Sequence, residues 1–234
     1  MTGRSGVAII PARGGSTRVP RKNIRPIDGI PAIVRVINTC LGSDCVDRVV
    51  VSTDDDEIAG VAKAAGAEVP FVRAASLADE HTGILPVIHH AIHELALDEY
   101  TSVGCVYATA VTLDRNDLLR GFDELSRCPE SLIVSVTSYG YPIQRALSMD
   151  LDGRVHLIDP ELATVRSQDL PERWHDAGQF IWGSAREWLR VDSVFSAAVG
   201  IDVPRWRVID IDTEEDWQLA EVLVRTIGSM GTSD

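Results

Sequence analysis

The sequence predicts an α/β fold with a mostly parallel sheet flanked by helices. Short apolar runs alternate along the chain with longer segments whose apolar residues have helical spacing. This alternation is typical of parallel strands joined by crossover helices. A chain of 234 residues is long enough for one domain that carries an insertion. We expect a single domain over residues 1–234, with residues 139–175 as a small β-rich excursion from the sheet.

The N-terminal half supplies the first strands and helices. An apolar run at residues 7–10 predicts a buried strand, and a loop rich in Gly, Pro and Arg follows it. Pro31 suits the first position of a helix that runs to Leu41. The next predicted strands cover residues 47–53, 68–72 and 102–108, and the next helices cover residues 54–67, 85–97 and 114–125.

The C-terminal half begins with a predicted strand at residues 131–138. The pattern then changes, because residues 145–158 read as a hairpin with Asp152 and Gly153 at its turn, and a polar segment follows. Residues 175–183 and 206–212 are predicted as strands, residues 184–190 and 213–228 as helices.

The charge balance argues against polyanionic partners. Lys and Arg number 22 against 35 Asp and Glu, which gives a formal net charge of -13. Such a surface should repel nucleic acids and anionic membranes. No apolar run is long enough to span a bilayer, the four cysteines show no C-x-x-C spacing, and the N-terminus lacks a signal-peptide pattern. We expect a cytoplasmic protein with reduced thiols.

The loop after the first strand concentrates positive charge around Gly14 and Gly15. In open α/β sheets, loops at the C-terminal ends of strands bind ligands, and adjacent glycines let N–H groups meet phosphate oxygens. The spacing matches neither the ATPase phosphate loop nor the dinucleotide motif. The sequence predicts an anion-binding loop of another type, with a solvated basic turn as the alternative. Its cations are Arg13, Arg18, Arg21, Lys22 and Arg25.

Asp210 and Asp212 are the main candidates for a metal site. In a strand, residues two apart point to the same face, so both carboxylates could meet one Mg²⁺ ion. In the alternative interpretation, Asp212 caps the last helix and Glu215 completes a capping box. Capping does not account for Asp210.

Two further patterns predict structural roles. Asp54 and Glu57 have capping-box spacing at the start of a predicted helix, which favours capping over metal binding. His89 and His93 lie one helical turn apart, as zinc ligands do, but the glutamate of H-E-x-x-H is missing. We expect a surface or packing role for both histidines.

An ordered set of motifs carries a family resemblance. The set comprises AIIPARGGS, RVPRKNI, VVVSTDD, GAEVPFVR, LADEHTG, LPVI, VYATA, SVTSYGYPIQRAL, RSQDL, HDAGQFIWG and DIDTEEDW. It resembles the cytidylyltransferases that activate nonulosonic acids, namely the CMP-sialic acid synthetases and, most closely, the pseudaminic acid cytidylyltransferases. The resemblance implies a Rossmann-like nucleotide-diphospho-sugar transferase fold.

The resemblance also implies a reaction. The anomeric hydroxyl of a nine-carbon 2-keto sugar acid would attack the α-phosphate of CTP and release pyrophosphate, with Mg²⁺ as cofactor. Pseudaminic acid is the expected substrate, with legionaminic or N-acetylneuraminic acid as the alternative. Residues 139–175 would form the dimerisation and substrate-binding part of a homodimer.

Site residues follow by matching positions to these motifs. Lys22, Arg13 and Asp212 would be catalytic, and Asp210 and Asp212 would hold the metal. The implied nucleotide-binding residues are Ala12, Arg13, Gly14, Gly15, Ser16, Arg18, Lys22, Asn23 and Arg73. The implied sugar-binding residues are Gln144, Arg145, Arg166, Gln168, His175 and Gln179.

Thr17 departs from the family pattern, because relatives usually carry a second phosphate-binding lysine there. Arg18 could supply the missing charge. The change supports an alternative of another class, a nucleotide-binding protein without turnover, which Lys22, Asp210 and Asp212 argue against. A metal-dependent glycosyltransferase would carry its acidic pair near the middle of the chain, whereas this pair lies near the C-terminus.

Overall fold

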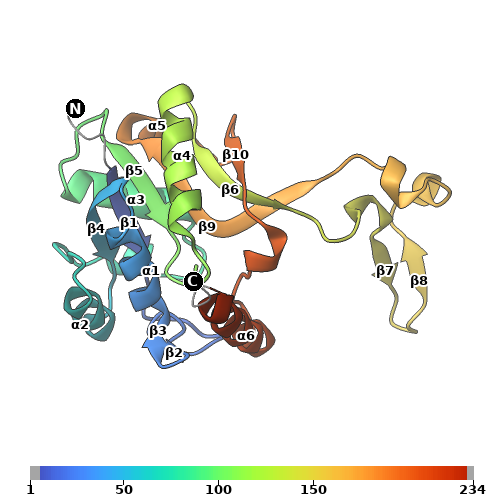
Figure 1. Cartoon of the computed structure of the whole chain (residues 1–234), viewed down its shortest axis with the longest axis horizontal. Helices are drawn as coiled ribbons and strands as arrows, with labels where there is room; N and C mark the ends of the chain where they lie inside the picture. Colours follow the sequence, from blue (N-terminus) through green and yellow to red (C-terminus); the bar gives the residue numbers. More distant parts are fainter. Residues whose placement is uncertain (1–5, 231–234) are drawn as a thin grey trace.

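The computed structural model describes residues 6–230 and centres on a six-stranded sheet (Figure 1). The strand order is β10-β6-β9-β5-β1-β4. β1 runs parallel to β4 and β5, and β10 runs parallel to β6, whereas β9 is antiparallel to both of its neighbours. The prediction of a mostly parallel sheet is confirmed. The strands are β1 (Gly6–Pro11), β4 (Val46–Ser52), β5 (Ser102–Val106), β6 (Ile133–Ser138), β9 (Trp174–Ser184) and β10 (Val199–Asp202).

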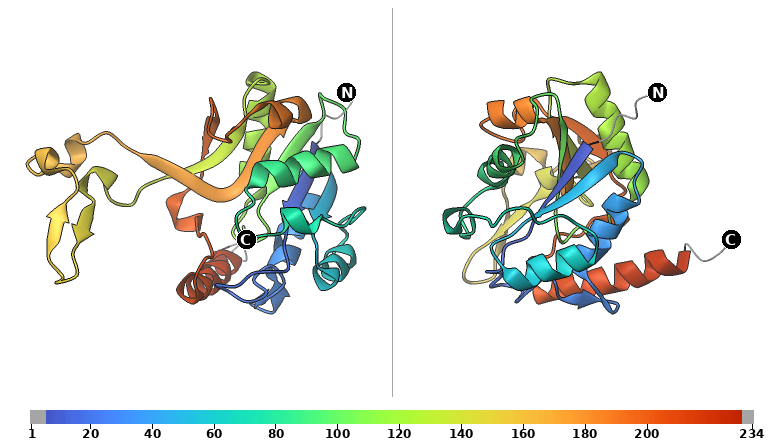
Figure 2. Two further views of the ribbon diagram at one scale, coloured as in Figure 1. Left: turned by 180° about the vertical axis from the view of Figure 1, so that it is seen from behind. Right: turned by 90° about the vertical axis from the view of Figure 1, so that its left-hand side faces the viewer.

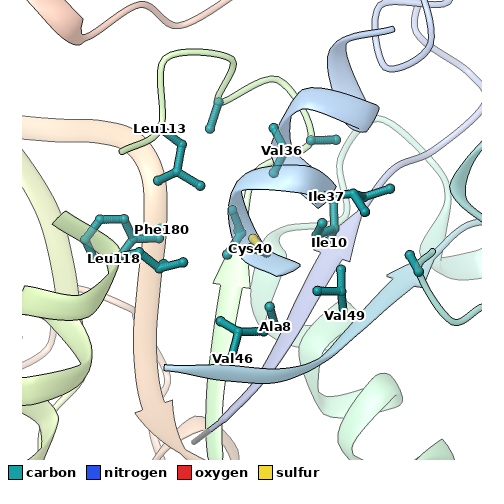
Figure 3. Close-up of a cluster of buried hydrophobic side chains, with 14 of the residues drawn as sticks. Ala8, Ile10, Val36, Ile37, Cys40, Val46, Val49, Leu113, Leu118 and Phe180 are labelled. Carbon is teal, nitrogen blue, oxygen red and sulfur yellow. The ribbon is translucent and has the colours of Figure 1, made fainter. Parts of the chain in front are cut away.

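Helices cover both faces of the sheet. Ala8 and Ile10 of β1 belong to the apolar cluster that contains α1 on one face, where Figure 3 shows Ile10 near Ile37. Alternate residues of β1 face a second apolar cluster that contains Ile88 of α3. Because both faces are covered, the strand is continuously apolar. The covering helices are α1 (Ala32–Leu41), α2 (Asp56–Ala64) and α4 (Arg115–Arg127) on the first face, α3 (Ile84–Glu94) and α5 (Ala185–Arg190) on the second.

The last helix, α6 (Glu214–Met230), lies beside a small hairpin of β2 (Pro26–Ile27) and β3 (Ile30–Pro31), away from the main sheet (Figure 1, Figure 2). A third apolar cluster joins α6 to this hairpin and to the loop after β1. The helix therefore packs against the loop that the sequence predicts to bind an anion. The cluster consists of Val19, Ile27, Ala32, Ile211, Trp217, Ala220 and Val224.

The segment between β6 and β9 projects far from the sheet and carries the antiparallel pair β7 (Leu147–Met149) and β8 (Val155–Leu157) (Figure 1). Gly153 has a φ of 79° at the turn, so the predicted hairpin is confirmed. The segment leaves several apolar side chains exposed, among them Tyr141, Leu147, Met149, Leu151, Val155 and Ile158. Its short 3-10 turns are η2 (Ile143–Arg145), η3 (Pro160–Leu162) and η4 (Ser167–Asp169).

Two strand predictions are wrong. In the described chain, residues 68–72 contribute one isolated bridge, between Glu68 and Val50, and the run contains Pro70, which has no N–H to donate. Residues 206–212 begin in the 3-10 turn η5 (Arg205–Arg207) and continue without strand pairing. The parallel neighbour of β6 is β10, a strand that the sequence analysis missed. Another 3-10 turn, η1 (Ala75–Leu77), follows Arg73.

The helices and the cysteines of residues 6–230 bear on membrane crossing and on disulfide bonding. Within that range, no helix combines the length and the apolar character that a bilayer crossing needs. Cys40, Cys45, Cys105 and Cys128 are free thiols. Burial raises the pKa of Cys40 to about 12, so this thiol is an inert core group at neutral pH.

Candidate active site

A cavity of about 420 Å³ lies where the loop after β1 leaves the sheet. Its position at the C-terminal end of β1 is the one at which α/β sheets bind ligands. Other lining residues come from the segment after Arg73 and from the end of β5. Six residues predicted from the sequence line this cavity: Arg13, Ser16, Lys22, Asn23, Arg73 and Asp210.

Asn23 fixes the shape of the loop. Its side-chain amide is buried and donates to the carbonyl oxygen of Arg13 at 3.0 Å. The chain turns at Arg21, which has a φ of 57°, and the carbonyl oxygen of Arg21 accepts from the N–H groups of Ile24 and Arg25. Asn23 therefore holds the two ends of the cationic loop together at the edge of the cavity.

The glycine pair has unequal surroundings. A Cβ atom on Gly14 would lie 2.7 Å from the carboxylate of Asp55, so this position requires glycine, while Gly15 faces open space. The N–H of Gly14 donates to Oδ1 of Asp54 at 3.0 Å, and the N–H of Ser16 donates to the carbonyl oxygen of Gly14. A phosphate that bound the N–H of Gly14 would have to displace Asp54.

The cationic loop faces the acidic segment directly, the acidic segment being residues 208–212 with Asp210 and Asp212. Nζ of Lys22 donates to the carbonyl oxygen of Ile211 at 2.8 Å and lies 3.5 Å from Oδ1 of Asp212. Arg18 pairs with the same carboxylate oxygen at 2.8 Å. The pKa of Asp210 is raised, first by burial and then by the charge of Asp212. Residues 206–212 do not form the strand that the sequence predicts. The two carboxylates are nevertheless close enough to repel each other.

The capping alternative for Asp212 is wrong. Oγ1 of Thr213 accepts from the N–H of Asp216, and Oδ2 of Asp216 accepts from the N–H groups of Thr213 and Asp212. The capping box at the start of α6 is therefore formed by Thr213 and Asp216, not by Asp212 and Glu215. The Asp212 carboxylate is left to face the cations of the loop.

The donor set of Asp210 and Asp212 fits a hard divalent cation. Carboxylate oxygens are the ligands that such ions prefer, and a cation between the two groups would relieve their mutual repulsion. Across the described residues, no group of three or more His, Cys, Asp or Glu side chains could hold a metal. A metal here would therefore take its remaining ligands from substrate or water.

Arg73 is a buried cation in the wall of the cavity. Its side chain is bonded to Ser52, through Nε to the hydroxyl at 3.1 Å and through Nη2 to the backbone carbonyl. Burial lowers the pKa of Arg73 to about 10, and the charge of Asp54 opposes this effect. The group remains positive at neutral pH, so the cavity offers a fixed charge to an electron-rich part of a ligand.

Sequence analysis missed several lining residues. Asp79, Thr82 and Tyr107 line the cavity, and Oδ1 of Asp79 accepts from the N–H groups of His81 and Thr82 at 2.7 Å each. These hydrogen bonds hold the pKa of Asp79 below its usual range. Tyr107 follows β5, and burial raises its pKa. The signal for Tyr107 was its place near the C-terminal end of the predicted strand at residues 102–108, which ends at the same edge of the sheet.

Four of the predicted sugar-binding residues belong to the projecting segment. Nε2 of Gln144 donates to the carbonyl oxygen of Pro171 at 2.8 Å, and Nη2 of Arg145 donates to that of Val165 at 2.5 Å. Arg166 forms an ion pair with Asp169 at 2.7 Å, and Gln168 is exposed. None of these four described residues lines the cavity of its own chain.

The other two predicted sugar-binding residues lie on β9. The ring of His175 lies 4.7 Å from that of Tyr139, centroid to centroid, and the side chain is half-buried. Gln179 is buried, and its Nε2 donates to the carbonyl oxygen of Arg207 at 3.0 Å. Oγ1 of Thr112 donates to the same carbonyl at 2.6 Å. Gln179 thus supports the chain that leads to Asp210 and does not line the described cavity.

The remaining patterns have structural roles. Helix α2 is capped by Asp55, whose Oδ1 accepts from the N–H groups of Glu57 and Ile58 at 2.9 Å each, so the predicted cap at Asp54 is wrong by one residue. Glu57 pairs with Arg21. The ring of His89 hydrogen-bonds the carbonyl oxygen of Trp188, so this histidine joins α3 to α5.

A cationic loop that faces two carboxylates, at the ligand-binding edge of an α/β sheet, is suited to hold a phosphorylated ligand next to a divalent metal. The cytidylyltransferase family profile matches residues 7–171, more than half of the chain. The chain belongs to the cytidylyltransferase family. Enzymes of this kind generally use a divalent metal.

Individual relatives agree with this assignment. The chain is 39% identical over 222 residues to pseudaminic acid cytidylyltransferase from Campylobacter jejuni, covering 94% of this chain and 96% of the relative. It is 29% identical to CMP-N,N'-diacetyllegionaminic acid synthase from Legionella pneumophila, covering 93% and 95%. The solved structure of CMP:2-keto-3-deoxy-manno-octonic acid synthetase complexed with CTP matches with a TM-score of 0.71 at 16% identity, covering 95% and 99%, which supports the fold.

Proposed function

We propose that the chain transfers CMP from CTP to pseudaminic acid and releases pyrophosphate. The observation that carries the proposal is the contact of Lys22 with the acidic segment at the rim of the cavity. This contact brings the cations suited to a triphosphate next to the carboxylates suited to a metal. The choice of pseudaminic acid rests on the similarity to the Campylobacter enzyme over nearly the full length of both chains.

In the proposed reaction, the anomeric oxygen of the sugar acid forms a bond to the α-phosphorus of CTP. The bond from that phosphorus to the bridging oxygen breaks, and pyrophosphate leaves with the electron pair. Lys22 and Arg13 would offset the negative charge that builds up on the phosphate oxygens. A carboxylate oxygen of Asp212 would accept the proton of the hydroxyl group. Ala12, Gly14, Gly15, Ser16 and Arg18 complete the proposed phosphate-binding loop, as the family motif implies.

Asp210 and Asp212 would hold Mg²⁺. When bound, the ion would neutralise phosphate charge and help to orient the two reacting groups. Asp212 would exchange its present partners, Arg18 and Lys22, for the metal, and those cations would turn to the phosphates. Arg73 and Asn23 would position the cytidine, since both line the same cavity.

We propose a homodimer built through the projecting segment. Gln144, Arg145, Arg166 and Gln168 lie on this segment and not at the cavity of their own chain, so we expect them to bind the sugar acid at the neighbouring protomer's cavity. His175 and Gln179 stay candidates through the family motif alone. The exposed apolar side chains of the segment support such an interface. Sedimentation velocity should show a dimer that Leu151→Asp weakens, and a wild-type monomer would refute this part of the proposal.

The decisive experiment measures pyrophosphate release with Mg²⁺ and CTP. Pseudaminic, legionaminic and N-acetylneuraminic acids are compared in parallel, with Lys22→Ala as the control variant. Release with pseudaminic acid alone, lost in the variant, supports the proposal. Release with another acid reassigns the substrate within the family. CTP binding without release from any acid favours a non-catalytic nucleotide-binding protein and draws attention to Thr17. We also propose a cytoplasmic location, which the free thiols support.

A further inference from the structure

The acidic segment that carries Asp210 and Asp212 is held by packing against α6 and not by strand pairing. Residues 208–212 make no strand pairing in the described chain. Ile211, between the two carboxylates, is fully buried in the third apolar cluster with Trp217 of α6. The position of the carboxylates relative to the cationic loop therefore depends on how α6 docks against that loop.

Arg25 joins the loop to α6 through a single side chain. Nη1 and Nη2 donate to the two carboxylate oxygens of Glu214 at 2.7 and 2.6 Å, which is a two-pronged ion pair. The guanidinium also lies 4.4 Å from the ring centroid of Trp217. The backbone of Arg25 is fixed as well, because its N–H donates to Arg21 and its carbonyl oxygen accepts from Ala32.

The other charged contacts between loop and segment use groups that the reaction needs. Arg18 and Lys22 both contact Oδ1 of Asp212. In the proposed function, these cations would turn to phosphate and Asp212 would hold the metal, so both contacts would be lost when substrate binds. The pair of Arg25 and Glu214 shares no group with the phosphates or the metal and can persist through the reaction.

We propose that Arg25 is a positioning residue, which holds the Asp210 and Asp212 segment against the Lys22 loop through Glu214 and Trp217 while substrate is bound. The inference rests on the proposed function, because it assigns the metal to those two carboxylates. We call the contacts of Arg25 with Glu214 and Trp217 the clamp. Loss of the clamp should allow the carboxylates of Asp210 and Asp212 to shift relative to the phosphates. Metal affinity and turnover should then fall together, whereas metal-free CTP binding should change little.

The test compares Arg25→Gln, Arg25→Lys and Glu214→Gln with wild type. Arg48→Gln is the matched control, because Arg48 forms an equally two-pronged ion pair with Glu68, with distances of 3.0 and 2.9 Å, away from the cavity. Mn²⁺ binding is measured by electron paramagnetic resonance in the presence of CTP without sugar acid. CTP binding without metal, kcat and the thermal midpoint are measured on the same samples.

We expect Arg25→Gln and Glu214→Gln to lower Mn²⁺ affinity and kcat about tenfold each, the lower end of the range of about 10- to 100-fold found when a residue that supports metal ligands is removed. Arg25→Lys should retain part of the Mn²⁺ affinity and part of kcat. Lysine keeps the positive charge, but it cannot bond both carboxylate oxygens of Glu214 as the planar guanidinium does. Arg48→Gln should leave both unchanged. The charge-swapped double variant Arg25→Glu with Glu214→Arg should bind Mn²⁺ more tightly than either single charge reversal.

Two results would overturn the inference. If Mn²⁺ affinity and kcat match wild type while the thermal midpoint falls, Arg25 has a purely structural role. If Arg48→Gln produces the same losses as Arg25→Gln, the effect is not specific to the clamp. An inactive wild-type protein that binds no Mn²⁺ with CTP would instead refute the proposed function, and the clamp would then have no metal site to position.

Discussion

The side-chain amine of Lys22 donates to the backbone carbonyl of Ile211 at 2.8 Å, which brings the first loop of the chain against a segment near its end. The two residues are 189 positions apart in sequence. Their contact links the two halves of the candidate site, one cationic and one anionic. Activity should accordingly be most sensitive to substitutions at this junction.

Lys22→Ala should lower kcat/KM about 100- to 1,000-fold, the loss typical when one donor to developing charge is removed. The thermal midpoint should change little, because the lysine is partly exposed and its partner, a backbone carbonyl, can bind water instead. Initial rates of pyrophosphate release check the prediction. Lys22→Arg keeps the positive charge and serves as the control. Activity of Lys22→Ala within about fivefold of wild type would assign the role to Arg13 or Arg18.

Arg73→Met should raise the KM for CTP about tenfold, because the cavity loses a fixed charge of its wall. The same change should leave the protein equally or more stable to heat, since it removes a buried cation whose pKa is lowered by burial. The backbone carbonyl of Ser52 keeps a partner, the N–H of Ala12 at 2.9 Å. Paired measurements of KM and thermal midpoint check this expectation. A variant with unchanged KM and reduced stability would show that Arg73 serves the fold alone.

Asp55→Ala and Asp54→Ala should behave differently although the residues are adjacent. Asp55 accepts two N–H groups at the start of α2, so its removal should cost about 1 kcal/mol in the free energy of unfolding. Asp54 accepts from Gly14 in the loop, so its removal should spare the helix and free an N–H for a phosphate. Urea unfolding and CTP titration of both variants check the contrast. Equal losses of stability would contradict the assignment of the cap to Asp55.

The elements that the sequence predicted correctly are those with the strongest patterns. The first strand is continuously apolar because both faces of β1 are covered, and α1 has a clear apolar face. Residues 206–212 gave a misleading signal, because Ile211 is buried against α6 and not within a sheet. An apolar run shows that a segment is buried, but it does not show which element covers it.

The candidate site was predictable only where the local sequence carries the signal. Local composition marked the cationic loop, and Lys22, Arg73 and Asp210 do line one cavity. The signal for Tyr107 was only its position near the end of a predicted strand, and the fold brings it to the same cavity. The exact acceptor of an N–H group also depends on backbone geometry, which is why the helix cap fell on Asp55 and not on Asp54.

Asp176 should make stability depend on pH. This residue of β9 is half-buried, and its Oδ1 accepts from the N–H of Gly178 at 2.8 Å. Burial raises the pKa of Asp176 and outweighs the opposite effect of that hydrogen bond. A carboxyl whose pKa is higher in the folded than in the unfolded state favours folding when both states are protonated. That contribution is lost as the pH rises through the folded-state pKa.

Asp176→Asn keeps an acceptor for Gly178 and removes the charge, so it should unfold at higher urea than wild type near about pH 8. The advantage should shrink as the pH falls toward about 4, the ordinary aspartate range, because the wild-type carboxyl then becomes neutral as well. Urea unfolding in metal-free buffer at several pH values measures the difference. Asp192→Asn, at an exposed position, controls for the general effect of removing a negative charge from an acidic protein. Two outcomes would contradict the prediction: Asp176→Asn is less stable than wild type at the higher pH, or the difference between the two proteins does not change with pH. Either would show that the surroundings of Asp176 stabilise its charged form.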